Sequence, residues 1–97
     1  MSAEIEELLK RYQNYPNVVG IIVLDPFAIP IKTTMDYTLT VHYAALISTL
    51  TFKAAKMVTN LDSSNELVNL RMRTLNHEVI VVPSESYIII VIQKPGT

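Results

Sequence analysis

The sequence predicts an α/β (α+β) fold, an α/β/α sandwich in which helices cover both faces of a five-stranded sheet. Two segments have helical periodicity, and five shorter segments are apolar or alternating and rich in β-branched residues. Of the 97 residues, 49% are hydrophobic and 18% are charged, whereas an average soluble chain is about 25% charged. Because a domain this small buries only about 60–65% of its unfolded surface, some apolar side chains are expected to contact another chain.

The first helix is expected over residues 2–15, with Ser2 as its N-cap and Pro16 ending it. Acidic residues occupy its first turns and basic residues its last ones, which complements the helix dipole. Apolar side chains recur at the spacing that lines one helix face, namely Ile5, Leu8, Leu9 and Tyr12. This helix should therefore lie with one face on the sheet.

Two strands are expected next, in neighbouring positions because only a short turn at Asp25–Pro26 separates them. Val18–Leu24 is almost continuously apolar, which is typical of a strand buried on both faces. Ile29–Thr34 alternates, and Pro30 cannot donate a ladder hydrogen bond. The second strand should therefore lie at an edge of the sheet.

A long helix is expected over Tyr37–Asn60, with Asp36 as its N-cap. Its only full charges are Lys53 and Lys56, so it lacks the charged face of an ordinary surface helix. One stripe is expected in the core: Tyr43, Ile47, Leu50, Ala54, Met57 and Leu61. A second stripe of mostly smaller groups is expected to meet another chain: Val41, Ala45, Ser48, Phe52 and Ala55.

The last third of the chain should hold three strands, at Glu66–Thr74, Val79–Val82 and Tyr87–Ile92. Short turns join them, so consecutive strands should pair. The third strand carries Arg71 and Arg73, charges of the kind that protect sheet edges. The first and fifth strands are the most apolar, which places them centrally and predicts the strand order 2-1-5-4-3.

The residues offer little chemistry, and we expect no catalytic, cofactor-binding or metal site. Cysteine is absent and there are two glycines, too few for a phosphate-cradling loop. His42 and His77 are interpreted as a helix-surface residue and a turn residue, and the aspartates as capping residues. A sequence pI near 6.0 argues against nucleic-acid binding. No window approaches the roughly 20 apolar residues of a membrane span, and the acidic N-terminus shows no targeting segment.

The whole chain, residues 1–97, resembles a roadblock-type dynein light chain and is read as one such domain. The resemblance rests on these segments: Gly20-Ile21-Ile22-Val23, Ile29-Pro30-Ile31-Lys32-Thr33-Thr34-Met35-Asp36, Tyr43-Ala44, Leu70-Arg71-Met72-Arg73, His77-Glu78-Val79, Pro83, and Tyr87 to Gln93. The family usually has Asn-x-x-Gly where this chain reads Asp25-Pro26-Phe27-Ala28. Loss of that glycine suggests an altered turn and a divergent paralogue.

The resemblance implies a homodimer whose long helices pack antiparallel and whose third strands join into a continuous ten-stranded sheet. It implies a non-catalytic adaptor that binds the dynein intermediate chain in the cytoplasm and supports microtubule-based transport. Relatives elsewhere in the superfamily regulate Ras-like GTPases, which is the alternative function. A small enzyme with a site across the dimer is a third, weaker option. Cytoplasmic or axonemal dynein, homodimer or heterodimer, and the intermediate-chain contacts stay open.

The predicted dimer interface follows from the second helical stripe and the third strand. Like charges directly opposite one another are destabilising, so the two-fold axis should lie at Leu70 or at a nearby lower register. An axis at Leu70 sets Arg71 beside Asn69 and Met72 beside Val68. The interface should cover enough apolar surface that folding depends on dimerisation. The expected interface residues are Val41, Ala45, Ser48, Phe52, Ala55, Val68, Leu70, Arg71 and Met72.

Overall fold

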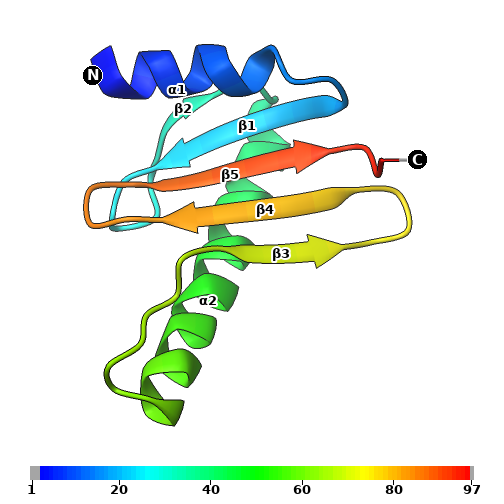
Figure 1. The fold of residues 1–97 in the computed structure, drawn as a ribbon. Coiled ribbons are helices and arrows are strands. Elements are labelled where there is room, and N and C mark those ends of the chain that lie inside the picture. The colour runs from blue at the N-terminus through cyan, green and yellow to red at the C-terminus, as the bar shows by residue number, and fades with distance from the viewer. Residues whose placement is uncertain (1–2, 97) are drawn as a thin grey trace.

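The computed structural model describes residues 3–96 as a five-stranded antiparallel sheet with one helix on each face (Figure 1). The strand order is β2-β1-β5-β4-β3, as predicted. The expected N-cap Ser2 lies outside the described residues. The elements are α1 (Ala3–Gln13), β1 (Val18–Leu24), β2 (Pro30–Thr33), α2 (Tyr37–Leu61), β3 (Leu70–Arg73), β4 (Glu78–Pro83) and β5 (Ile88–Gln93).

The central strands β1 and β5 are buried on both faces, because each supplies alternate side chains to two separate cores. On one face, Ile5 and Leu9 of α1 pack on the core residues Ile21, Val23, Ile89 and Val91. On the other face, Ala44 and Ile47 of α2 pack on Ile22, Leu24, Val79, Val81, Ile90 and Ile92. The prediction of helices on both faces is confirmed.

Gly20 lets the segment before α2 approach β1 closely. A Cβ atom at this position would lie 2.5 Å from Sδ of Met35, well inside van der Waals contact. Met35 directly precedes Asp36, whose carboxylate accepts a hydrogen bond from the Leu39 N–H at 2.8 Å. Asp36 is thus the predicted N-cap, and α2 begins where the sequence indicates.

The helix α2 crosses the sheet and continues beyond the edge strand β3 (Figure 1). The face that packs on the sheet is made of Thr40, Ala44, Ile47 and Thr51. It lies between the two stripes, so the first stripe forms part of the core only through Ile47 and the partly buried Tyr43, and the prediction was wrong for the exposed Leu50, Met57 and Leu61. Met57 is 58% exposed and Leu61 is 80% exposed, because the end of the helix has no strand beneath it.

The third strand is shorter than the alternating sequence indicates. The predicted strand Glu66–Thr74 contains only the four residues Leu70–Arg73. Leu70 pairs with Val81 of β4, so the position facing Val68 falls on Pro83, which has no N–H to donate. Residues 66–69 therefore keep a strand-like sequence without a partner strand inside the chain.

Neither α1 nor α2 has the length and hydropathy that crossing a membrane would require, within the part of the chain that the structure describes.

Candidate functional site

The titratable side chains of residues 3–96 do not form a catalytic or metal-binding constellation. These residues contain no cluster of three or more histidine, aspartate and glutamate side chains able to hold a metal ion. His77 belongs to the turn between β3 and β4, where its N–H donates to the Thr74 hydroxyl at 3.0 Å. The interpretation of His77 as a turn residue is confirmed.

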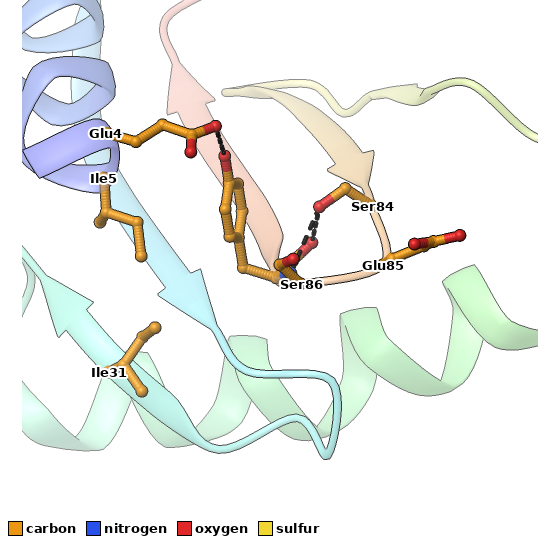
Figure 2. Close-up of a pocket in the computed structure, with 7 residues that line it drawn as sticks. Glu4, Ile5, Ile31, Ser84, Glu85 and Ser86 are labelled. Carbon is orange, nitrogen blue, oxygen red and sulfur yellow. Dashed lines mark hydrogen bonds between the residues drawn. The ribbon is translucent and has the colours of Figure 1, made fainter. Parts of the chain in front are cut away.

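A shallow hollow of about 830 Å³ lies between the start of α1 and the turn from β4 to β5 (Figure 2). In it, the Tyr87 hydroxyl donates to Glu4 at 2.8 Å, and this hydrogen bond raises the pKa of Tyr87. The Ser84 hydroxyl donates to the Tyr87 carbonyl at 2.9 Å, so no base activates it. Figure 2 shows Glu85 pointing away from the other labelled side chains. The contacts in the hollow are structural.

The free edge of β3 carries a small charged network. Arg71 donates to Oε1 of Glu78 at 2.8 Å, and the amide of Gln93 donates to the same oxygen at 2.7 Å. The hydrogen bond from Arg71, followed by the one from Gln93, lowers the pKa of Glu78. This network holds the Arg71 side chain toward β4 and β5. Because β3 is the last strand of the sheet, its outer backbone edge has no pairing strand among the described residues.

Beside this edge lies an apolar hollow of about 350 Å³ between β3 and one flank of α2. Leu46 is 71% exposed there, although it belongs to neither predicted stripe. Its signal in the sequence is its spacing of four residues before Leu50. The lining residues are His42, Tyr43, Leu46, Ile47, Leu50 and Met72. An exposed apolar surface of this kind is typical of an interaction site.

The structure separates the predicted interface residues into three groups. Leu70 and Met72 adjoin the α2 flank of Tyr43 and Leu50, and Val68 and Arg71 are exposed along the same edge. Ser48, Phe52 and Ala55 instead lie with the turns at the end of the sheet. Val41 and Ala45 are exposed nearer the start of α2. Whether these residues contact a second copy stays a prediction.

In the turn from β1 to β2, Ala28 stands where the family that this sequence resembles usually has glycine. Ala28 adopts a φ of 69°, in the left-handed region that disfavours side chains with a Cβ atom. The Asp25 carboxylate accepts hydrogen bonds from the N–H groups of Phe27 at 2.8 Å and Ile29 at 3.0 Å. These bonds hold the turn in the conformation that glycine would adopt more easily.

Comparisons with known proteins agree with this architecture. The family model described as the Roadblock/LC7 domain matches residues 4–94. A crystal structure of a Roadblock/LC7 domain from Streptomyces avermitilis superposes with a TM-score of 0.80 at 14% identity, covering 89% of this chain and 73% of that one. MglB from Myxococcus xanthus superposes with a TM-score of 0.75 at 16% identity, covering 95% of this chain and 76% of that one. At these identities the superpositions show the fold.

Proposed function

Because the chain belongs to the Roadblock/LC7 domain family, we propose that it is a non-catalytic, dimeric adaptor subunit. Its proposed role is that of a light chain of the dynein motor complex, located in the cytoplasm, that binds the intermediate chain and supports microtubule-based transport. The main support for a dimer is that two surfaces without a partner in the described chain lie next to each other. The unpaired edge of β3 and the exposed apolar flank of α2 meet at Met72.

The length of β3 supports pairing with a second copy. Residues 66–69 alternate like a strand but lack a partner within the chain. With the two-fold axis at Leu70, these residues would face residues 71–74 of the second copy. Each chain would then complete the strand of the other, and Arg71 would face Asn69 instead of another arginine.

The overhanging end of α2 supports the same arrangement. The end of α2 extends past β3 (Figure 1), and Met57 and Leu61, which belong to the last part of this helix, are exposed. Antiparallel pairing of two such helices would cover these side chains with the flank that contains Tyr43, Leu46 and Leu50. The exposed apolar surface, which is costly in a lone chain, would become an interior seam.

Co-purification tests the proposed partner. The wild-type chain, shown to be dimeric by light scattering, is mixed in parallel with a dynein intermediate-chain fragment and with Ras-like GTPases in both nucleotide states. We expect the intermediate-chain fragment to co-elute with the dimer. Retention of a GTPase without the intermediate chain would overturn the dynein role in favour of the regulatory alternative, and a monomeric chain would overturn the dimer.

A further inference from the structure

A groove runs along the flank of α2 that faces away from the Met72 hollow. It consists of a wider hollow of about 480 Å³ and a narrower one of about 290 Å³, which share Ala55, Pro83 and Ser84. Phe52 and Ala55 lie on the side of the helix opposite Leu46 and Leu50, since successive residues are 100° apart. The groove therefore stays open when the proposed dimer surface is covered.

The wider hollow contains a buried hydroxyl with no partner. Thr51 is 4% exposed, and its Oγ1 has no hydrogen-bond partner within the described chain. The neighbouring hydroxyls donate elsewhere, Ser48 to the Ala45 carbonyl at 3.2 Å and Ser84 to the Tyr87 carbonyl at 2.9 Å. An unpaired buried hydroxyl is unfavourable, and because Oγ1 is covered by the chain itself, this part of the hollow offers a bound group apolar contact in place of a hydrogen bond.

Exposed phenylalanines contribute to the lining of the wider hollow. Phe27, from the turn between β1 and β2, is 84% exposed, and Phe52 of α2 is 67% exposed. Large aromatic side chains of this kind dominate binding energy at protein interfaces. The lining of this hollow contains no charged residue, which favours a neutral, apolar occupant.

The narrower hollow adds negative charge at the other end of the groove. Its lining includes Glu66 and Glu85, and neither carboxylate forms an ion pair among residues 3–96. Lys56 lies over the Phe52 ring at 5.8 Å and is outside both linings. The groove is thus apolar at one end and acidic at the other.

We propose that this groove binds a segment of a partner protein that carries an apolar or aromatic side chain followed by lysine or arginine. The apolar side chain occupies the wider hollow between Phe27 and Phe52. The basic side chain lies against Glu66 and Glu85. This assignment moves Ser48, Phe52 and Ala55 from the self-association surface to a second binding surface.

Fluorescence anisotropy with a labelled peptide tests the charge requirement. The probe is Gly-Tyr-Leu-Ala-Lys-Lys with blocked ends, and the matched control has both lysines replaced by glutamate. We expect the lysine peptide to bind the wild-type dimer at least about tenfold more tightly than the glutamate peptide. Equal affinities, or no binding of the lysine peptide at millimolar concentration, would overturn the proposal.

A matched pair of variants locates the peptide on the chain. Glu85→Lys should weaken binding of the lysine peptide by about tenfold because it reverses the charge at the acidic end. Glu7→Lys makes the same change on α1, outside both hollows, and should leave the affinity unchanged. An equal effect of the two variants would show that only the net charge matters, contrary to the proposal.

Two further variants separate binding from folding and from dimerisation. Thr51→Val should raise thermal stability and leave the peptide affinity unchanged, since it removes a covered, unpaired hydroxyl and keeps the side-chain shape. Weaker peptide binding by this variant would contradict a purely apolar contact at this part of the hollow. Phe52→Ala should weaken peptide binding more than about tenfold while light scattering still shows a dimer. A monomeric Phe52→Ala variant would show that Phe52 belongs to the self-association surface and would overturn its assignment to the groove.

Discussion

At the residue scale, Ala28 is the position where the chain departs most clearly from a low-energy backbone. Its φ of 69° costs an L-residue roughly 1–2 kcal/mol. Ala28→Gly removes this backbone strain but raises the conformational entropy of the unfolded chain, which offsets part of the gain. The net stabilisation should be about 1 kcal/mol. Urea unfolding measures the difference.

The control for Ala28→Gly is the same substitution in a helix. Ala45→Gly lies on an exposed face within α2 and should destabilise by about 1 kcal/mol, because glycine is a poor helix former. Destabilisation by both changes would contradict the assignment of strain to Ala28.

Glu78 makes the free energy of unfolding depend on pH under acidic conditions. Its folded-state pKa lies below the ordinary 4.5 because Arg71 and then Gln93 donate to the carboxylate. Its contribution to stability is therefore fully present above about pH 4.5 and is lost as the pH falls through the folded-state pKa. Glu78→Gln should flatten this acid-side loss in urea titrations. Glu7→Gln should retain the wild-type slope, and an equal flattening would contradict the role of Glu78.

At the element scale, the start of α2 is fixed by its N-cap residue, Asp36. The Asp36 carboxylate accepts from the Leu39 N–H at 2.8 Å, which satisfies one of the unpaired donors of the first turn. Asp36→Ala should destabilise the chain by about 1 kcal/mol, whereas Asp36→Asn should restore most of the loss. Equilibrium unfolding monitored by helical circular dichroism distinguishes these outcomes, and equal losses would show that the charge matters more than the cap.

The lengths of the other elements depend on their neighbours. Local alternation predicted a strand from Glu66 to Thr74, but a strand exists only where a partner offers donors and acceptors. Pro83 is the last residue of that partner strand and faces the position of Val68, so residues 66–68 have no further donors and acceptors opposite them in β4. The boundaries of β1, β4 and β5 were close to the prediction, because their apolar runs coincide with their pairing partners.

At the scale of the whole molecule, the exposed flank of α2 predicts that folding is coupled to association. The melting temperature should rise with protein concentration, as expected when the folded state is a dimer. Leu46→Asp should give a monomer and lower stability by at least about 2 kcal/mol, although Leu46 is exposed in the single chain. Light scattering and thermal melts over a hundredfold concentration range measure both effects.

Two further variants delimit the interface. Thr49→Asp, an exposed change one helical turn before Lys53, should leave the dimer intact. Leu70→Asp should disrupt the dimer through the β3 edge. A stable monomeric Leu70→Asp variant with an unchanged melting temperature would refute the coupling of folding to dimerisation.

The sequence by itself determined the number and kind of elements, the strand order, the edge position of β2 and the cap of α2. These features follow from local periodicity, from proline and turn chemistry, and from hydropathy, all of which act between residues close along the chain. The apolar excess and the scarcity of reactive groups likewise indicated association in place of catalysis.

Only the tertiary structure decided which face of α2 is buried, how short β3 is, and that Thr51 lacks a partner. Each depends on where the helix crosses the sheet and where a neighbouring strand ends, which are relations between distant segments. Helical spacing places the two stripes on different flanks of the helix but cannot show that the face between them meets the sheet. The proposed division of these stripes between a dimer surface and a separate groove therefore rests on the packed molecule.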